Sequence, residues 1–428
     1  MEGMAARAAS AKDGRKDKTC GHGGGYGEPR ELTRTDAESG FEQTLWLPEG
    51  FDFRVLATAG GPMSDGGTVP LGHGAMACFA TGEAGVWRLL RNHEERSDPF
   101  DGGGVTTMSI RWEQGAPVLE RAWRSLSGTL ANRAGGPTPW GSWLSCEATT
   151  AGTGGGRDTE HGYVFEVPSH ASREVAPVPL KAMGRFAHEA VAVDPGTRIV
   201  YETEDRSTAG FYRFLPKTPG RLAEGGRLQM LKATGEWNFD TRTGRRVGKS
   251  IPVEWVDIDE PDPRDAEAVP LAVFNQGWAR GAAVFGRLEG CWWGEGAVYL
   301  ASASGGDEGE GQIWEYTPDE RGGLLKLVFE SPDAELLSSP DDVTVAPSGN
   351  LLLCEGSGRG LPAVRGLTRS GEVFPFAHYE GDAEWRGATF SPDGGVLFVN
   401  LRGTATADPA LEPGRTIAVW GPWGEGVL

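Results

Sequence analysis

Short acidic segments recur along this chain, each beside a run of apolar residues. The segment "RNHE" ends on Glu94, "FAHEAV" carries Glu189, "YETEDR" carries Asp205 and "GRLEG" carries Glu289. Carboxylates that lie close together repel one another unless some are protonated or a cation lies between them. The side-chain oxygens of Asp, Glu and Asn are the ligands that Ca²⁺ prefers. If the fold brings these segments together, they predict a cation site in which calcium is the favoured ion.

Four further oxygen donors and two arginines are also candidate residues of this site. The additional donors are Asn92, Glu147, Asp342 and Glu355. Arg287 stands two residues before Glu289, and Arg133 lies in the glycine-rich segment "NRAGGPTPWG". A guanidinium group binds phosphate or carboxylate oxygens in pairs. An arginine this close to a candidate metal-binding carboxylate favours phosphate as the substrate group.

A repeat marks the strands that would position these residues. A turn glycine is followed six positions later by a polar residue, with a short apolar run between them. The copies are Gly141 to Glu147, Gly196 to Glu202, Gly296 to Ser302, Gly349 to Glu355, Gly394 to Asn400 and, one residue longer, Gly85 to Asn92. Each copy predicts a strand of about five residues that begins at a turn and ends on a polar group.

The spacing of the repeat predicts a six-bladed β-propeller. Most intervals between successive glycines are close to the roughly 40–50-residue period of propeller blades. The longest interval, from Gly196 to Gly296, equals one blade plus an insertion around residues 217–280. We expect the repeated strands to be the innermost strand of each blade, so that their polar ends converge on the central channel. The alternative is a β-sandwich with regularly spaced turns.

The composition agrees with an all-β protein. Among 428 residues, 66 Gly and 28 Pro supply turns and interrupt helices.

A formal net charge of −19 argues against nucleic acid as a partner. No apolar run reaches the roughly 18 residues of a membrane-spanning helix, so we expect no membrane association. The five cysteines are scattered and form no CxxC pair, which argues against a disulfide framework or a structural zinc site.

The polar N-terminal region differs from the rest of the chain. We expect residues 1–43 to form a disordered tail and residues 44–428 to form a single propeller domain that acts as a monomer. The first 40 residues lack the apolar core of a secretory signal, so they are not a secretory signal as written.

Several of these segments together resemble one known family. The segments "RNHE", "GGPTPWGSWLSCE", "GRFAHEA", "YETEDR", "GRLEG" and "SPDDVTVAPSGNLLLCEG" resemble those of the PhoX-type alkaline phosphatases, in order, between about residues 44 and 423. The resemblance implies an exported enzyme that hydrolyses phosphomonoesters, with iron and calcium ions on the axis of a six-bladed propeller. It implies that Glu189 and Glu289 bind iron and that Arg287 binds phosphate. The calcium-site positions that it implies are Asn92, Glu94, Glu147, Asp205, Asp342 and Glu355.

The sequence departs from the family pattern at Arg133. The family resembles Asn-Cys-Ala-Gly-Gly at this point, and its cysteine thiolate binds iron. A guanidinium is always protonated and only donates hydrogen bonds, so Arg133 cannot replace that ligand. We therefore expect a calcium-bearing phosphoesterase with an altered or absent iron site. The alternatives are a non-catalytic propeller that binds calcium and a phosphorylated ligand, and a calcium-dependent lactonase.

Overall fold

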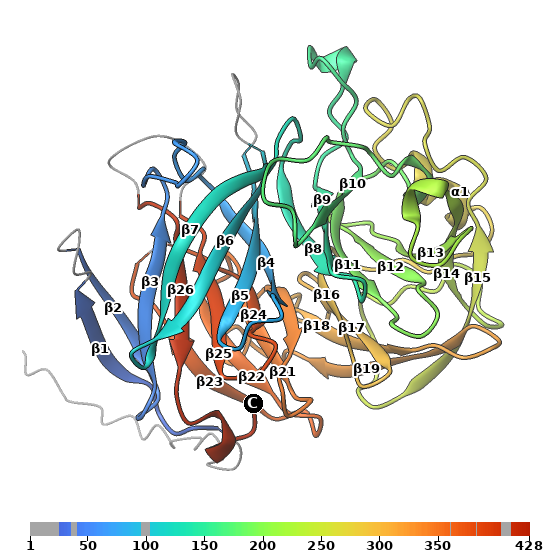
Figure 1. Cartoon of the computed structure of the whole chain (residues 1–428). Coiled ribbons are helices and arrows are strands. Elements are labelled where there is room, and N and C mark those ends of the chain that lie inside the picture. Colours follow the sequence, from blue (N-terminus) through green and yellow to red (C-terminus); the bar gives the residue numbers. More distant parts are fainter. Residues whose placement is uncertain (1–24, 36–40, 96–102, 360, 382, 404–411) are drawn as a thin grey trace, which may run out of the picture.

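The computed structural model of the chain describes residues 25–35, 41–95, 103–359, 361–381, 383–403 and 412–428. Antiparallel strands make up nearly all of the regular structure (Figure 1). The described residues contain one α-helix, α1 (Ala272–Trp278), and four short 3₁₀ turns at Thr153–Gly155, Lys181–Met183, Leu222–Glu224 and Trp423–Glu425. No helix in this part of the chain has the length and apolar character needed to cross a membrane. The prediction of an all-β fold is confirmed.

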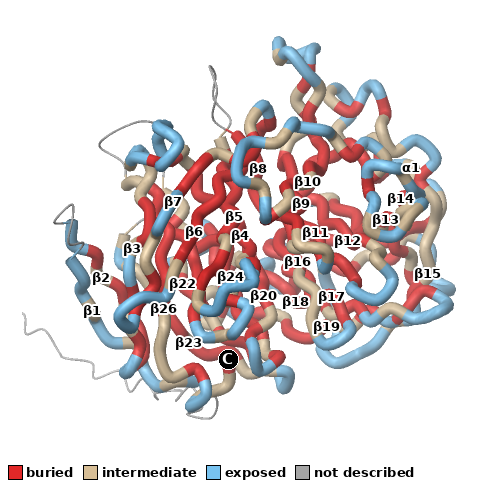
Figure 2. The backbone as a smooth tube through the Cα atoms, in the orientation of Figure 1, coloured by how far each residue is buried: buried red, intermediate tan, exposed pale blue. Residues whose placement is uncertain are grey.

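Six strands enclose the central channel. Each belongs to a different blade and packs against the innermost strand of the next blade, which closes the ring (Figure 1). They are β4 (His73–Ala80), β8 (Asn132–Pro137), β11 (His188–Val193), β16 (Leu288–Gly294), β20 (Pro340–Val345) and β24 (Trp385–Phe390). The centre of the molecule, where they lie, is buried (Figure 2). This closed ring of six confirms the predicted number of blades.

The channel inside the ring is nearly filled. Small residues line it because larger side chains would collide with the next blade. A Cβ atom on Gly290 would lie 2.8 Å from the amide nitrogen of Val343, and one on Gly74 would lie 2.4 Å from the carbonyl oxygen of Arg133. The cavity that remains between the strands is about 10 Å³, room for one water molecule at most. The interior of the channel between these strands therefore has no room for a substrate.

The strands of the glycine repeat are the second strands of the blades, so the prediction that they are innermost is wrong. They are β5 (Val86–His93), β9 (Ser142–Glu147), β12 (Val200–Glu204), β17 (Ala297–Ser302), β21 (Leu351–Glu355) and β25 (Val396–Leu401). Each pairs with the innermost strand that precedes it, and the repeat glycine lies in the turn between them. The repeat predicted the hairpins correctly. It did not show which strand of a hairpin is innermost, because innermost strands such as β4 and β8 contain several Gly and Ala residues and lack a distinctive apolar run.

The polar residues at the ends of these second strands support the innermost strands from behind. In four blades, the last side chain of the second strand contacts the backbone two residues before the innermost strand. The contacts are Glu147 with the Leu130 amide, Glu355 with the Ser338 amide, Ser302 with the Gly286 carbonyl and His93 with the Leu71 carbonyl. These side chains therefore fix the start of the innermost strand instead of pointing at the axis.

The third and fourth strands complete the blades. The third strands are β6 (Gly104–Glu113), β10 (Val164–Pro168), β13 (Phe211–Pro216), β18 (Gln312–Thr317), β22 (Ala363–Leu367) and β26 (Arg415–Trp420). The fourth strands are β7 (Ala116–Leu126), β14 (Gly226–Ala233), β19 (Gly323–Glu330), β23 (Val373–His378) and β3 (Asp52–Thr58). β3 comes from the N-terminal part of the chain and pairs with β26, which joins the two ends of the propeller in one sheet.

Two further strands extend the blade that begins with β20. β2 (Glu42–Leu47) pairs with β23, and β1 (Arg30–Thr35) pairs with β2. The expected tail over residues 1–43 is therefore too long, since residues 30–35 form a strand. Leu32 packs against the core of this blade, a contact that the polar sequence around it conceals. Residues 1–24 and 36–40 lie outside the described residues.

β15 (Ser250–Asp257) joins two neighbouring blades. It pairs with β14 on one side and with β19 on the other, so the two blades form one nine-stranded sheet. The insertion expected around residues 217–280 is smaller than predicted, because β14 within it is the regular fourth strand of its blade. The additional segment consists of β15, α1 and the loops that connect them.

Candidate functional site

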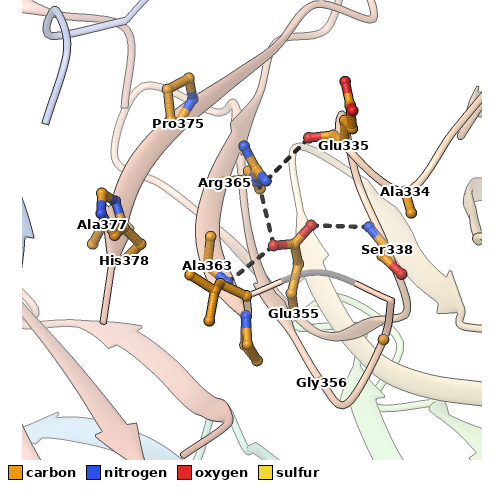
Figure 3. Close-up of a pocket in the computed structure, with 13 residues that line it drawn as sticks. Ala334, Glu335, Ser338, Glu355, Gly356, Ala363, Arg365, Pro375, Ala377 and His378 are labelled. Atoms are coloured by element: carbon orange, nitrogen blue, oxygen red, sulfur yellow. Dashed lines mark hydrogen bonds and ion pairs between the residues drawn. The ribbon is translucent and has the colours of Figure 1, made fainter. Parts of the chain in front are cut away.

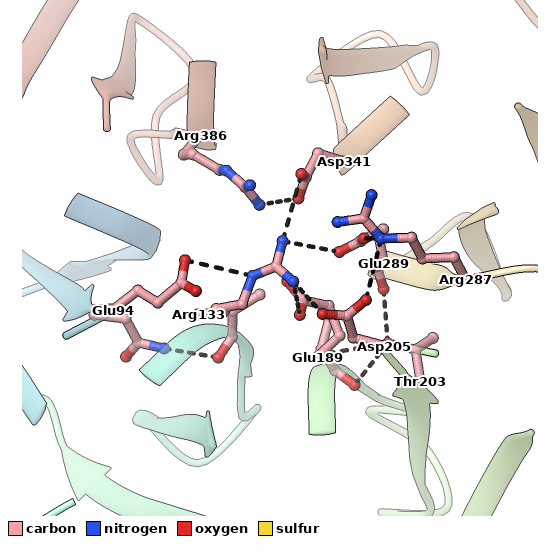
Figure 4. Close-up of polar contacts among 12 residues, drawn as sticks. Glu94, Arg133, Glu189, Thr203, Asp205, Arg287, Glu289, Asp341 and Arg386 are labelled. Carbon is pink, nitrogen blue, oxygen red and sulfur yellow. Dashed lines mark hydrogen bonds and ion pairs between the residues drawn. The ribbon is translucent and has the colours of Figure 1, made fainter. Parts of the chain in front are cut away.

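The second residue of each innermost strand lies at one end of the channel. In chain order these residues are Gly74, Arg133, Glu189, Glu289, Asp341 and Arg386. The pairing of every innermost strand with its second strand shifts register close to this position. Such β-bulges re-aim a side chain relative to the regular strand. Figure 4 shows the five side chains of this set turned toward one another.

The guanidinium group of Arg133 lies at the centre of this arrangement. Its Nη1 atom is 3.3 Å from Oε2 of Glu189, and its Nη2 atom is 3.3 Å from Oε2 of Glu289 and 3.5 Å from Oδ2 of Asp341 (Figure 4). Nη1 also donates a hydrogen bond to Asp205. Burial lowers the pKa of Arg133, but the surrounding carboxylates outweigh this effect and hold the pKa well above its usual value. Arg133 is therefore a fixed positive charge.

Asp205 connects Arg133 to a second arginine nearer the surface. The Nε atom of Arg287 lies 3.2 Å from Oδ1 of Asp205 and 2.7 Å from Oε1 of Glu289. The Arg287 side chain is 40% exposed, whereas that of Arg133 is 5% exposed. Burial raises the pKa of Asp205, but Arg133 and Arg287 together hold it below its usual value. Asp205 is thus an ionised link between the buried ring and the channel mouth.

Two more arginines pair with the outer side of the ring. Arg386 pairs with Asp341, and its Nη2 atom lies 2.9 Å from Oε2 of Glu384. Arg402 has its Nη2 atom 3.0 Å from Oε2 of Glu94, whose same oxygen lies 3.5 Å from Nε of Arg133. The acidic ring is therefore partly neutralised by the protein itself.

Three carboxylates of the ring have the arrangement of a metal site. Single oxygens of Glu189, Glu289 and Asp341 lie within 4.8 Å of one another, and all three residues are buried. The carboxylate oxygens of Glu189 and Glu289 accept no hydrogen bond of acceptable geometry among the described residues. Burial raises the pKa of both groups well above the usual value. Unsatisfied buried carboxylates of this kind fit a cation in their donor chemistry. We call these three residues the acidic triad.

Most of the predicted site residues come together here. Arg287, Glu289, Glu189, Asp205 and Glu94 belong to the ring or contact it. Asp342 follows Asp341 on β20 but turns into the channel, where it accepts a hydrogen bond from the Gly387 amide at 2.8 Å. Burial and the neighbouring Asp341 raise the pKa of Asp342 to about 6.

The structure does not bring Asn92 and Glu147 into the ring. The side-chain oxygen of Asn92 accepts hydrogen bonds from Trp143 and Ser145, at 2.7 and 2.9 Å. Glu147 accepts hydrogen bonds from three backbone amides and contacts the His161 ring. Protein donors already surround the oxygens of both side chains, and their role as calcium ligands stays a prediction.

Glu355 lies at a different place, in the wall of a separate cavity of about 370 Å³ (Figure 3). Its carboxylate accepts hydrogen bonds from the amides of Ser338 and Ala363, both at 2.9 Å, and contacts Arg365. As with Glu147, these donors belong to its own blade. A calcium role for Glu355 likewise stays a prediction.

Sequence reasoning missed part of the ring. The segment "SSPDDVTVAP" contains both Asp341 and Asp342, but the resemblance points to Asp342, and Arg386 and Arg402 are not among the predicted site residues. The available signal is position: Asp341 and Arg386 are each the second residue of an innermost strand, as Glu189 and Glu289 are, whereas Arg402 directly follows a second strand. That alignment could be made only by assigning the innermost strands correctly.

Comparisons with known proteins agree with this architecture. The family model described as alkaline phosphatase PhoX matches residues 104–404. The structure of Pseudomonas fluorescens PhoX in complex with vanadate, a transition state analogue, has a TM-score of 0.72 and 17% sequence identity, and the match covers 94% of this chain and 98% of that chain. A gluconolactonase from Xanthomonas campestris is less similar, with a TM-score of 0.42 and 12% identity over 92% of this chain and 95% of that chain. No curated protein sequence matches this chain.

Proposed function

This chain belongs to the alkaline phosphatase PhoX family, and we propose that it hydrolyses phosphomonoesters at the end of the channel where the ring of carboxylates and arginines lies. The observation that carries this proposal is the position of Arg287. Its Nε atom is held by Asp205 and Glu289, and among the described residues neither Nη atom donates a hydrogen bond. A guanidinium fixed at Nε presents both Nη atoms as a fork that matches two phosphate oxygens.

The backbone at Arg287 supports a functional role for this side chain. The residue before the innermost strand has a positive φ in four blades: Gly72 (57°), Ala131 (52°), Arg287 (48°) and Ser339 (47°). Of these four residues, Gly72, Ala131 and Ser339 are small, and only Arg287 has a long side chain. Any residue with a Cβ atom has a steric cost in this conformation, which Ala131, Arg287 and Ser339 share, and such backbone strain is found at functional sites. We infer that Arg287 is placed there to bind substrate.

The other residues of the site position Arg287 and compensate charge. Asp205 and Glu289 orient the guanidinium, and the ionised state of Asp205 keeps it paired. The acidic triad would hold a divalent cation, and calcium is the ion that an all-oxygen donor set favours. When bound, the cation would neutralise charge on the phosphoryl oxygens. A thiolate-bound iron has no ligand at position 133, because Arg133 offers only donors.

Hydrolysis of p-nitrophenyl phosphate, measured with and without added Ca²⁺, tests the proposal. We expect Ca²⁺-dependent turnover, and Arg287→Gln should lower kcat/KM by about 10²-fold because one phosphate clamp is lost. The matched control is Arg227→Gln, which removes an arginine whose side chain is 62% exposed and whose nearest carboxylate oxygen, on Asp257, is 3.8 Å away. An Arg287→Gln variant as active as the control would contradict the proposal.

A second candidate is a propeller that binds phosphate without turning it over. The observation in its favour is Arg133, which occupies the acidic triad with a permanent positive charge. Calorimetric binding of inorganic phosphate that requires Arg287, together with no hydrolysis of any phosphomonoester at saturating Ca²⁺, would support this candidate over the enzyme.

A further inference from the structure

The guanidinium of Arg133 and a metal ion would occupy the same space. The three nearest carboxylate oxygens of the acidic triad lie 3.3–3.5 Å from its Nη atoms. Ca²⁺ needs its oxygen ligands at about 2.3–2.6 Å. The triad oxygens lie within 4.8 Å of one another, so an ion between them would lie close to the guanidinium that contacts all three residues. A guanidinium has no lone pair to offer a metal, so it cannot stay as a ligand.

We propose that Arg133 is a tethered internal cation that competes with a divalent metal ion for the acidic triad. With the guanidinium between Glu189, Glu289 and Asp341, the triad holds no metal. When a metal binds, the guanidinium leaves the triad. The proposal concerns only the competition between Arg133 and a metal ion for the triad. Its test therefore does not depend on whether the protein hydrolyses phosphomonoesters.

The contacts of Arg133 with the triad are loose enough for such an exchange. Charge-assisted hydrogen bonds between nitrogen and oxygen are typically about 2.7–2.9 Å long, and the triad contacts exceed this range. Neither Glu189 nor Glu289 accepts a well-aligned hydrogen bond from it. Arg133 therefore compensates the charge of these carboxylates but leaves their lone pairs available to another ligand.

Asp205 gives the displaced guanidinium a partner. Of the five carboxylates around Arg133 it is the most exposed, at 17%, and it accepts a hydrogen bond from Nη1. It also lies toward Arg287 and the channel mouth. Arg133 can keep this contact while its Nη2 atom leaves Glu289 and Asp341. A divalent ion attracts the triad carboxylates more strongly than the single charge of a guanidinium does, and the cost of removing water from the ion opposes this gain.

Calorimetric titration of wild type and Arg133→Gln with Ca²⁺ and with Mn²⁺ tests the competition. We expect Arg133→Gln to bind one ion about tenfold or more tightly than wild type, because the competing cation is gone. Adding Glu289→Gln to that variant should abolish the gain, since it removes a ligand of the triad. Arg133→Lys keeps a positive charge and should bind metal as weakly as wild type.

The matched control is Arg402→Gln. It removes the same charge from the edge of the ring, where Arg402 pairs with Glu94 and Glu384 and does not touch the triad. A gain in metal affinity as large as that of Arg133→Gln would show a general electrostatic effect and overturn the proposal. Equal affinity of Arg133→Gln and wild type would overturn it as well.

Removal of the Arg133 guanidinium can also lower the stability of the folded protein, and this effect provides a second test of the proposal. Arg133→Gln should have a lower melting temperature than wild type without metal and should gain more from added Ca²⁺ than wild type does. If the variant is unfolded without metal by circular dichroism, saturating Ca²⁺ should restore it. A variant that stays unfolded at saturating Ca²⁺ would contradict the replacement of guanidinium by metal.

Discussion

Arg133 and Arg287 each bind one oxygen of the same carboxylate. Arg133 donates to Oδ2 of Asp205 and Arg287 donates to Oδ1. One of these arginines is buried in the acidic triad and the other is half exposed at the channel mouth. Asp205 therefore links the guanidinium that lies in the acidic triad to the proposed phosphate-binding arginine, and a change in the position of one arginine should alter the position of the other.

Replacing Asp205 with Asn tests this link. Asn keeps the size of the side chain but removes the charge that holds both guanidinium groups. We expect KM for p-nitrophenyl phosphate to rise about tenfold with a smaller change in kcat, because Arg287 loses its orientation. We also expect a loss of roughly 1–2 kcal/mol in the free energy of unfolding at pH 7. An unchanged KM would show that Asp205 does not position Arg287.

The same variant has a predicted pH signature. The folded pKa of Asp205 is lower than the unfolded value of about 3.9, so its stabilising effect is present above about pH 4 and is lost as pH falls through the folded pKa. Urea unfolding at several acidic pH values should therefore show a smaller difference between wild type and Asp205→Asn as pH falls.

Glu202 is expected to destabilise the protein at alkaline pH. It is fully buried, and burial raises its pKa well above the usual value. Its Oε2 atom lies 3.3 Å from Nδ1 of His188, whose Nε2 atom contacts the Gly184 carbonyl oxygen. Burial lowers the pKa of His188 to about 3, so its Nδ1 is a free acceptor for a protonated Glu202.

A group with a raised folded pKa stabilises the fold below its unfolded pKa, and this stabilisation is lost as pH rises through the folded value. The amide of Glu202→Gln can donate a hydrogen bond to Nδ1 of His188, 3.3 Å away, at every pH. We expect it to raise the free energy of unfolding by roughly 1–2 kcal/mol at pH 8 and to have little effect near pH 4. A variant less stable than wild type at pH 8 would show that Glu202 is ionised in the fold.

Glu147 is expected to matter for folding in the absence of any metal. Its carboxylate accepts hydrogen bonds from the amides of Leu130, Gly162 and Tyr163. Glu147→Ala would leave these buried donors unpaired and should cost roughly 3 kcal/mol. The loss should be the same with a chelator and with Ca²⁺, whereas a calcium ligand would show the loss only when Ca²⁺ is present. Glu315→Ala, at a partly exposed position, is the control.

Ser339→Gly should stabilise the protein. Ser339 has a φ of 47°, a conformation that glycine adopts without steric cost, and its side chain makes no hydrogen bond within the described part of the chain. We expect a gain of roughly 0.5–1 kcal/mol in urea unfolding, after the greater flexibility of glycine in the unfolded chain is subtracted. A loss of stability would indicate that the Ser339 hydroxyl has a packing role.

The sequence was informative where a local pattern repeats. Glycine turns and short apolar runs predicted six blades, because each hairpin needs a tight turn and a buried strand. The pattern could not separate the innermost strand from the second, since β8 ("NRAGGP") is short, bulged and rich in small residues. This error placed Glu147 and Glu355 on the axis and passed over Arg386.

The local sequence identified only some of the acidic residues that belong to the ring. Glu189 and Glu289 were identified because each lies in a segment that resembles the family. Asp341 and Asp342 are adjacent, and which one enters the ring depends on the register shift between Pro340 and Asp342. A bulge of this kind is set by contacts between strands and leaves no mark in the residues themselves.

The pairing of β3 with β26 also sets when the site can form during synthesis. β3 is made early, but the strand that it pairs with is among the last to leave the ribosome. Until then the blade that carries Arg386 and Arg402 is incomplete, so the ring of carboxylates and arginines can close only after nearly the whole chain has been made.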